Sequence, residues 1–226
     1  MGAFADLIFP PKCAGCDLPG TLLCERCAEA ISRINPASSC PRCGAPDGAV
    51  VCRECHGRAF SFEAARCSAL LAHPVSRAVV LLKDGGERRY ARVLAGLLAD
   101  AGGDWLAGGD VIVPVPASPA AVRRRGFDHA ADLARALSRA TGLSTARPLR
   151  SSASADQRAL GRGDRFENRR GAFRVEADAR VPERIVLVDD VFTTGATLDA
   201  AASVLRAAGA SSVRVLAVAR AVRPSA

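Results

Sequence analysis

The sequence predicts an α/β protein with a mostly parallel sheet, preceded by a small cysteine-rich module. In the second half of the chain, apolar runs typical of buried strands alternate with segments of helical spacing, and this alternation favours a parallel sheet. Near the amino end, eight of the nine cysteines form four Cys-x-x-Cys pairs among turn residues. A chain of 226 residues is long enough for one or two domains. We therefore expect a metal-binding module over residues 1–60 and an α/β domain over residues 61–226.

The elements of the α/β domain follow from the spacing of apolar residues and from the residues that end each segment. Residues 61–110 are expected to be mostly helical, with a break at Asp84-Gly85-Gly86, because apolar residues recur three and four positions apart. Gly142 and Gly209 each follow a helical segment and are expected to end it. The expected strands are residues 111–115, 184–189 and 212–219, and the expected helices are residues 128–141 and 197–208.

The positive charge of the chain is concentrated in one segment. Residues 121–174 contain thirteen arginines and five acidic residues, so they account for the whole net charge of +8. The part "LRSSASADQRALGRGDRFENRRGAF" has few apolar residues and is expected to be a loop. The arginines could close over an anionic leaving group, track the backbone of single-stranded nucleic acid, or form an ordinary solvated face. They are Arg123, Arg124, Arg125, Arg158, Arg162, Arg165, Arg169 and Arg170.

The cysteine pairs indicate structural zinc. Two Cys-x-x-Cys turns supply the four thiolates of a tetrahedral Zn²⁺ site, and no open ligand position is suggested. The gaps between successive pairs are seven, twelve and eight residues, which favours two sites from neighbouring pairs but leaves interleaved pairing open. Redox activity of one pair is a weaker alternative. The expected ligands are Cys13, Cys16, Cys24 and Cys27 for one ion, and Cys40, Cys43, Cys52 and Cys55 for the other.

The use of cysteine also suggests a compartment. The first residues, "MGAFADLIFPPKCAGC", lack the features of a signal peptide, and no uninterrupted apolar run reaches eighteen residues. We therefore expect a cytoplasmic protein in a reducing environment, with no insertion into a membrane. The ninth cysteine, Cys67, is expected to be a small buried apolar residue.

The stretch "RIVLVDDVFTTGATLDA" carries the strongest chemical signal. Ligands of open parallel sheets bind beyond the carboxyl ends of the strands, where Asp189 and Asp190 are expected. The loop that follows leads into a helix, whose free amides and dipole favour a phosphate. We interpret the two carboxylates as binding the vicinal hydroxyls of a ribose whose 5-phosphate sits in that loop. The alternative is an exposed acidic turn with Thr197 as a helix cap.

The segment "IVLVDDVFTTGAT" resembles the phosphoribosyl diphosphate (PRPP) motif of type I phosphoribosyltransferases. Together with the four cysteine pairs, "VPVPAS", "RRRGFDHAADLARAL" and "DQRALGRGDRFENRRGAF", it occurs in the order typical of the ComF/GntX family, and the resemblance covers essentially the whole chain. That family combines a double zinc ribbon with a phosphoribosyltransferase domain, and some members are linked to DNA uptake during competence. The resemblance implies a type I phosphoribosyltransferase-like parallel sheet with helices on both faces.

The resemblance also implies roles for particular residues. Asp189 and Asp190 would bind the ribose hydroxyls, and Arg125 of the "RRRGFD" segment would contact the substrate. The 5-phosphate loop would comprise Thr193, Thr194, Gly195, Ala196 and Thr197, and the diphosphate loop Pro114, Val115, Pro116, Ala117 and Ser118. One departure is Asp128, where the family usually has asparagine, so any ligand contact assigned to that amide is in doubt.

These observations lead to a main hypothesis and two alternatives. The main one is a protein that binds PRPP or a related ribose phosphate with Mg²⁺, with transfer of the phosphoribosyl group to an unidentified acceptor as its enzymatic form. The alternatives are a non-catalytic single-stranded DNA-binding protein that acts with the competence machinery in DNA uptake, and a zinc-ribbon scaffold with an inactive transferase domain. Lys83 is expected near a phosphate or at the surface, and His129 is expected to be structural.

Overall fold

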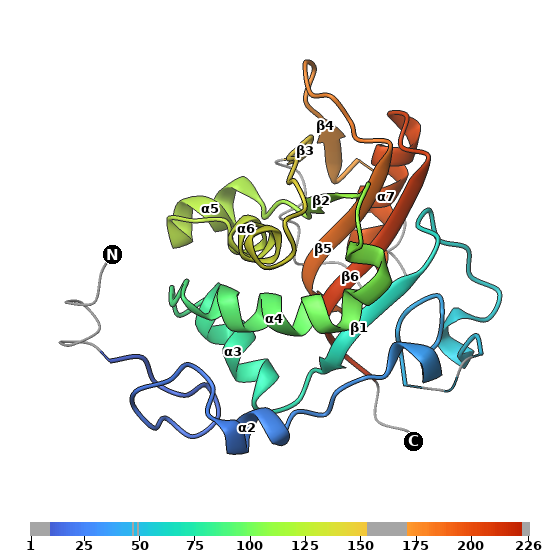
Figure 1. The fold of residues 1–226 in the computed structure, drawn as a ribbon. Coiled ribbons are helices and arrows are strands. Elements are labelled where there is room, and N and C mark those ends of the chain that lie inside the picture. Colours follow the sequence, from blue (N-terminus) through green and yellow to red (C-terminus); the bar gives the residue numbers. More distant parts are fainter. Residues whose placement is uncertain (1–9, 47, 49, 153–170, 223–226) are drawn as a thin grey trace.

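The computed structural model describes residues 10–46, 48, 50–152 and 171–222, and its core is a four-stranded parallel sheet (Figure 1). The strands lie in the order β1-β6-β5-β2, and all three pairings are parallel. They are β1 (Ala65–Leu70), β2 (Val111–Pro114), β5 (Arg184–Phe192) and β6 (Ser212–Arg220). The predicted mostly parallel sheet is therefore confirmed.

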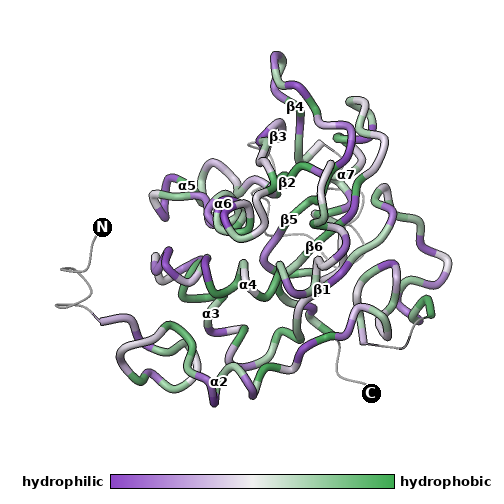
Figure 2. Tube along the Cα trace, viewed as in Figure 1, coloured by the Kyte–Doolittle hydropathy of each residue, from purple (hydrophilic) through white to green (hydrophobic). Residues whose placement is uncertain are grey.

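Helices cover both faces of the sheet, as the family resemblance implies. On one face, Val186 and Val188 of β5 belong to a core that includes Leu94, Leu98 and Leu133. On the other face, β5 packs with the helix that follows it. The first face carries α3 (Val75–Lys83), α4 (Tyr90–Gly102) and α6 (His129–Thr141), and the second carries α7 (Ala196–Ala207). Figure 2 shows the contrast between the hydrophobic central strands and the hydrophilic α5 (Pro119–Arg125).

Several expected boundaries are confirmed. Helix α3 ends at Lys83 and α4 begins at Tyr90, so the helical structure is interrupted at Asp84-Gly85-Gly86, as predicted. Helix α6 begins after Asp128 and ends before Gly142, which adopts the left-handed conformation that favours glycine. Cys67 is buried, as expected.

Other expectations were incomplete. The largely helical prediction for residues 61–110 missed strand β1, whose small buried residues Ala65, Cys67 and Ala69 give no clear strand signal. Strand β5 also extends past Asp189 to Phe192, because Val191 and Phe192 still pair with β6. An antiparallel pair that the sequence did not predict joins β3 (Leu149–Ser151) and β4 (Phe173–Val175).

The cysteine-rich segment consists of short elements that pack on two different parts of the core. Cys40, Cys43, Cys52 and Cys55 belong to the same buried core as α7, whereas Ala14 and Leu22 pack with α3 and α4. The described part of this segment contains α2 (Glu25–Glu29), η1 (Pro36–Ser38) and η2 (Arg53–Cys55), and a further short helix, η3 (Gly103–Leu106), follows α4. Among the helices that the structure describes, none is both long and apolar enough to cross a membrane.

Candidate functional site

The carboxyl ends of β2 and β5 bring two of the predicted loops together. Pro114 pairs with Val188, and the amide of Val115 donates to the Val188 carbonyl at 2.9 Å. Ser118 caps α5 through its Oγ, which accepts a hydrogen bond from the Ala121 amide at 3.2 Å. The structure therefore places the 114–118 loop at the sheet edge, one strand away from the acidic pair.

Asp190 is buried and bound by two side chains from different helices. Lys83, the last residue of α3, places Nζ 2.7 Å from Asp190 Oδ2. His129, the first residue of α6, places Nε2 3.5 Å from the same oxygen. Both partners contact Oδ2, so Oδ1 is the atom that suits a further donor such as a ligand hydroxyl. The sequence left the role of Lys83 open and gave His129 no role in the site.

The hydrogen bonds of His129 indicate which of its nitrogens carries the proton. Nη1 of Arg125 lies 3.4 Å from His129 Nδ1. Because a guanidinium can only donate, Nδ1 must accept and Nε2–H must face Asp190. Asp84 in turn binds Arg125, with Oδ1 3.0 Å from Nη2. Arg125, predicted to contact substrate, is thus connected to Asp190 through His129.

The two adjacent aspartates differ in acidity. Burial, followed by the negative charge of Asp190, raises the pKa of Asp189 well above its usual value. Burial alone would also raise the pKa of Asp190, but the hydrogen bond from His129 and the ammonium of Lys83 outweigh it and hold that pKa below its usual value. The pair therefore combines one firmly ionised carboxylate with one that resists ionisation. One carboxylate oxygen from each of Asp189 and Asp190 and one ring nitrogen of His129 all lie within 4.8 Å of one another.

The predicted 5-phosphate loop, residues 193–197, forms the turn between β5 and α7. Thr193 and Thr194 are exposed, and Gly195 precedes the helix with φ +79°. A Cβ at Gly195 would lie only 2.7 Å from Cζ of Phe192, so both the backbone conformation and the space require glycine. Helix α7 begins at Ala196, followed by Thr197, and the amide of Ala196 donates to Thr194 Oγ1 at 3.4 Å, so the amino end of the helix adjoins the threonines of the turn.

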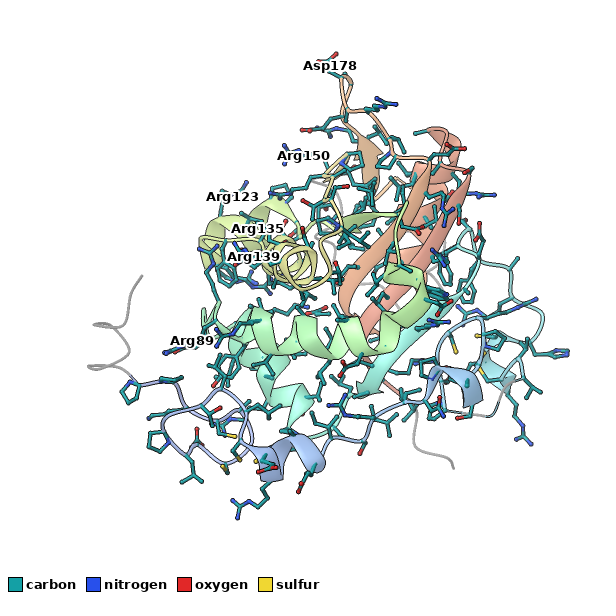
Figure 3. All side chains as sticks on the ribbon, in the orientation of Figure 1. Arg89, Arg123, Arg135, Arg139, Arg150 and Asp178 are labelled. Carbon is teal, nitrogen blue, oxygen red and sulfur yellow. The ribbon has the colours of Figure 1, made fainter. Side chains whose placement is uncertain are left out.

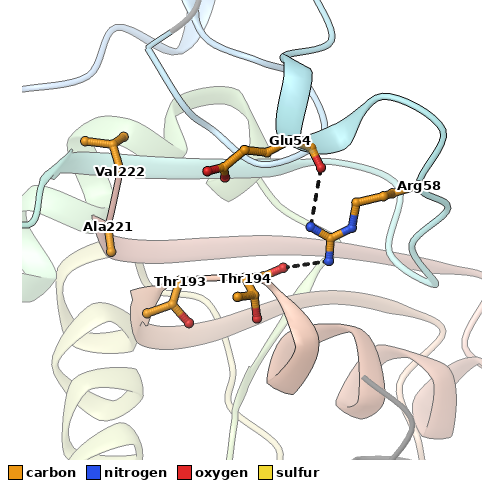
Figure 4. A pocket seen from close by; sticks show the side chains of 6 residues that line it. All are labelled: Glu54, Arg58, Thr193, Thr194, Ala221 and Val222. Atoms are coloured by element: carbon orange, nitrogen blue, oxygen red, sulfur yellow. Dashed lines mark hydrogen bonds between the residues drawn. The ribbon is translucent and has the colours of Figure 1, made fainter. Parts of the chain in front are cut away.

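A pocket of about 260 Å³ lies beside the 5-phosphate loop (Figure 4). Nη2 of Arg58 donates to the Thr194 carbonyl at 3.3 Å, which ties the loop to the segment after the last cysteine pair. Asp189 and Asp190 do not line this pocket. Its lining residues are Glu54, Arg58, Thr193, Thr194, Ala221 and Val222. Glu54 and Arg58 were not predicted as pocket residues, because their only signal in the sequence is their place within three residues of Cys55.

The cysteines gather as two sequential clusters. In each set the four sulfur atoms lie within 4.8 Å of one another, which resolves the pairing that the spacing left open. The Cys13–Cys24 and Cys43–Cys52 sulfur pairs are each 3.6 Å apart. A tetrahedral zinc ion with Zn–S bonds of about 2.3 Å would hold its sulfurs about 3.8 Å apart, so both sets fit zinc. The first cluster is Cys13, Cys16, Cys24 and Cys27, and the second is Cys40, Cys43, Cys52 and Cys55.

Backbone amides support both clusters. The amide of Cys24 donates to Cys13 Sγ at 3.3 Å, and the amide of Cys52 donates to Cys40 Sγ at 3.4 Å. Such hydrogen bonds orient sulfur ligands and stabilise their negative charge. The two sets therefore have the donors, the spacing and the supporting hydrogen bonds of closed Cys₄ sites.

The basic segment is only partly described. Arg123 and Arg124 are exposed at the end of α5, and Arg139 is exposed on α6. Figure 3 shows Arg123, Arg135 and Arg139 projecting from neighbouring parts of α5 and α6. The other arginines named from the sequence, Arg158, Arg162, Arg165, Arg169 and Arg170, lie outside the described residues.

Asp128, the departure from the family pattern, acts locally. Its Oδ1 accepts hydrogen bonds from the amides of Ala130 at 3.1 Å and Ala131 at 3.3 Å, which caps α6. Its Oδ2 lies 3.2 Å from Arg147. Both carboxylate oxygens are therefore engaged within the protein, and the cap is one that asparagine could also make.

Comparison with known proteins agrees with this arrangement. A model of the phosphoribosyl transferase domain matches residues 120–224. The DNA utilization protein YhgH of Salmonella typhi is 31% identical over 222 residues, which is 92% of this chain and 96% of that protein. Competence protein F of Haemophilus influenzae is 34% identical over 116 residues, 50% of this chain and 51% of the relative.

One solved structure, that of the allosteric regulatory enzyme of purine biosynthesis, resembles 56% of this chain and 25% of its own, with 22% identity and a TM-score of 0.40. The family assignment depends on the curated relatives rather than on this structural likeness. Because a relative 31% identical is matched over 92% of this chain, and a shorter match reaches competence protein F, the chain belongs to the ComF/GntX family of proteins with a phosphoribosyltransferase-type domain.

Proposed function

We propose that this chain binds PRPP or a related ribose phosphate with Mg²⁺, and that it transfers the phosphoribosyl group to an acceptor. The observation that carries this proposal is the convergence of three features at one sheet edge. Asp189 and Asp190 lie in the carboxyl-terminal half of β5, the glycine turn of residues 193–197 precedes and opens α7, and the 114–118 loop follows the neighbouring strand. An acidic pair between two anion-binding loops suits a sugar that carries phosphate groups at both ends.

The residues of the site support a division of roles. Asp190, ionised and held by Lys83 and His129, would accept hydrogen bonds from one ribose hydroxyl, and Asp189 would bind the other. In the transfer, the bond between C1 and the diphosphate oxygen breaks, and the acceptor forms a new bond to C1 with its lone pair. The diphosphate leaves with the bonding electrons. The fixed negative charge of Asp190 then lies near a sugar that is developing positive charge, which favours this step.

The residues also fit the two expected metals. Mg²⁺ prefers oxygen ligands and is commonly held by substrate phosphates with one or two carboxylates, so it would enter with the diphosphate and offset its charge. Zn²⁺ would occupy the two cysteine clusters as a structural ion, since each cluster already supplies four sulfurs. We assign the module of residues 1–60 to zinc binding and residues 61–226 to the ribose phosphate.

Titration calorimetry tests the proposal. The zinc-loaded protein is titrated with PRPP in the presence of Mg²⁺, alongside the Asp189→Ala/Asp190→Ala variant. Asp178→Ala serves as the matched control, because Asp178 is an acidic residue outside the site, in the turn before β5 (Figure 3). Saturable binding by the wild type and the control, lost in the double variant, is the expected result. Equal binding by all three proteins would refute the assignment of the acidic pair.

A second candidate function is single-stranded DNA binding in DNA uptake with the competence machinery. The observation in its favour is the set of exposed arginines Arg123, Arg124 and Arg139 on neighbouring helices. The names of the relatives, a DNA utilization protein and a competence protein, point in the same direction. These arginines could bind phosphates of a nucleic acid backbone without reading its sequence.

Salt dependence separates this function from the first. Binding of a labelled single-stranded oligonucleotide is measured over a range of salt for the wild type and for Arg123→Ser/Arg124→Ser. Arg125 is left intact, because it also supports His129. If each arginine contacts a phosphate, the slope of log affinity against log salt decreases by about 1 for each residue removed. Arg53→Ser, on the cysteine-rich segment, is the control. If it decreases the slope by as much per arginine as Arg123→Ser/Arg124→Ser does, a specific DNA-binding face is contradicted.

A further inference from the structure

Arg220, the last residue of β6, is a buried charge between the second cysteine cluster and the 5-phosphate loop. The residue is 2% exposed. On the cluster side, Nη2 donates to Cys43 Sγ at 3.7 Å and to Glu54 Oε2 at 2.8 Å. On the loop side, Nη1 donates to the carbonyls of Thr193 at 2.9 Å and Phe192 at 3.5 Å. One guanidinium therefore joins a metal-ligating sulfur to the backbone of the loop.

Residues just after the second cluster contact the same loop. Arg58 lies three residues beyond Cys55, the last cysteine of the cluster, and its Nη2 donates to the carbonyl of Thr194. The ring of Phe60 packs below the turn, where Cε1 lies 3.2 Å from the position that a Cβ on Gly195 would occupy. The loop thus rests on the segment that the cluster holds in place.

The first cluster has different neighbours. Asp17 pairs with Arg77 of α3 at 2.5 Å, and the hydroxyl of Tyr90 of α4 donates to the Lys12 carbonyl. Figure 1 shows this part of the chain beside α3 and α2, away from α7. In the described parts of the chain, the contacts of the first cluster therefore lead to the helices and not to the 5-phosphate loop.

Charge and folding connect the two sites that Arg220 joins. A guanidinium remains charged and must be paired when it is buried. A zinc ion with four thiolates carries a net charge of about −2, which suits the position of Arg220. Small cysteine modules lose their fold when the metal leaves. Loss of the metal from the second cluster would therefore displace Cys43 and Glu54, and the anchor of the Thr193 carbonyl would be lost with them.

From these contacts we propose that metal binding at the second cluster and phosphate binding at residues 193–197 are coupled, with Arg220 as the positioning residue between them. The proposal rests on the proposed function, because it takes those residues as the site of a sugar phosphate. Coupling of this kind is reciprocal in binding free energy: a ligand on the loop must strengthen metal binding at the second cluster by the factor with which the metal strengthens ligand binding. The first cluster should not take part.

Zinc release from each cluster separately tests the coupling. The variant Cys16→Ser keeps a complete second cluster, and Cys52→Ser keeps a complete first cluster. Zinc transfer to a chromogenic chelator is followed with and without saturating ribose 5-phosphate. At equilibrium with the chelator, the expected result is zinc affinity at least about fivefold higher in Cys16→Ser with the ligand, and no change in Cys52→Ser. Equal ratios in the two variants would overturn the proposal.

Two substitutions test Arg220 itself in the Cys16→Ser background. Arg220→Gln should remove most of the effect of ribose 5-phosphate on zinc affinity. Because Arg220→Gln also deprives a buried site of its charge and can impair folding, Glu54→Gln provides a milder second variant. The Glu54 side chain is 37% exposed, so its loss weakens the link without opening the core. An unchanged ligand effect in a folded Glu54→Gln protein would contradict the role of the bridge.

Hydrogen exchange separates failure of this inference from failure of the proposed function. Binding of ribose 5-phosphate is first measured by calorimetry. If it binds but leaves zinc affinity unchanged, the coupling is wrong and the phosphate site stands. If neither ribose 5-phosphate nor PRPP with Mg²⁺ binds, the proposed function fails, and amide exchange at residues 193–197 tests the Arg220 link on its own. Faster exchange after zinc loss from the second cluster, but not from the first, supports the Arg220 link, and unchanged exchange overturns it.

Discussion

Replacing the two adjacent aspartates by asparagine, one at a time, should change stability in opposite directions. Asn keeps the size of the side chain and removes the charge. Asp189 is half-buried and resists ionisation because it is shielded from water beside the charged Asp190, so Asp189→Asn relieves an unfavourable charge. Asp190 is favourably ionised by Lys83 and His129, so Asp190→Asn leaves the ammonium of Lys83 without its counter-charge. The two variants therefore test the assignment of charge within the pair.

The burial of the partners sets the size of the effect. Loss of one partner from a fully buried ion pair costs about 3–5 kcal/mol, and an exposed pair contributes about 1 kcal/mol or less. The Asp190 side chain is 5% exposed, but that of Lys83 is 34% exposed and can turn toward water. We therefore expect Asp190→Asn to cost about 1–3 kcal/mol, which lowers the Tm of a chain of this size by roughly 2–12 °C. Asp189→Asn should stabilise by on the order of 1 kcal/mol.

The pH dependence distinguishes the two effects further. The folded pKa of Asp190 lies below its unfolded value of about 3.9, so its contribution is complete above that value and lost only as the pH falls through the folded pKa. The loss in Asp190→Asn should therefore be constant between pH 5 and 8. The folded pKa of Asp189 lies above its unfolded value, so its penalty grows as the pH rises toward the folded pKa. The gain in Asp189→Asn should increase from pH 5 upward.

Differential scanning calorimetry of the wild type and both variants, at several pH values between 5 and 8, measures these differences. Zinc content is measured in each sample, so that a difference in Tm caused by loss of metal can be recognised. A lower Tm for Asp189→Asn, or a higher Tm for Asp190→Asn, would refute the reasoning about the pair.

The remaining predictions concern the loop, the helix cap and the metals. Gly195→Ala should weaken ribose phosphate binding at least about tenfold in a calorimetric titration, because the added methyl group meets Phe192 and the residue has φ +79°; unchanged affinity would contradict the model of the loop. Asp128→Asn should change the free energy of unfolding in urea by less than about 0.5 kcal/mol, whereas Asp128→Ala should cost about 1 kcal/mol by removing the cap. Elemental analysis should find two zinc ions per chain in the wild type and one in Cys52→Ser; a Cys67→Ser control should keep both.

The parts of the site that lie together in the sequence could be predicted from it. Asp189, Asp190 and Gly195 belong to one continuous stretch, in which a strand, a loop and a helix follow each other and fix their own geometry. The Cys-x-x-Cys spacing likewise predicts metal binding by the cysteines. Local sequence is sufficient where a single turn of the chain brings the functional groups together.

The groups that arrive from distant elements could not be predicted in the same way. Lys83 and His129 meet on Asp190 only because α3 and α6 cover the same face of the sheet, and neither residue has a distinctive sequence neighbourhood. In the sequence, Arg220 is the last residue of an ordinary strand, and only the structure shows that its guanidinium donates to both Cys43 Sγ and the Thr193 carbonyl. Such contacts depend on packing between elements, about which spacing along the chain says nothing.

The pairing of the cysteines shows the same limit. Gaps of seven, twelve and eight residues are compatible with sequential or interleaved sites. The choice depends on where the segment is held against the core: one set lies near α3 and α4, and the other packs with the core that includes α7. Strand β1 was missed for a related reason, because its burial comes from pairing with β6 rather than from large apolar side chains.

The measurement that tests the central claim most directly is a crystal structure of the zinc-loaded protein with PRPP and Mg²⁺. The account predicts the ribose hydroxyls within hydrogen-bond distance of Asp189 and Asp190, the 5-phosphate on the amides of residues 193–197, and the diphosphate beside residues 114–118. A well-ordered ligand whose sugar lies away from both aspartates, for example on the arginines of α5 and α6, would contradict it.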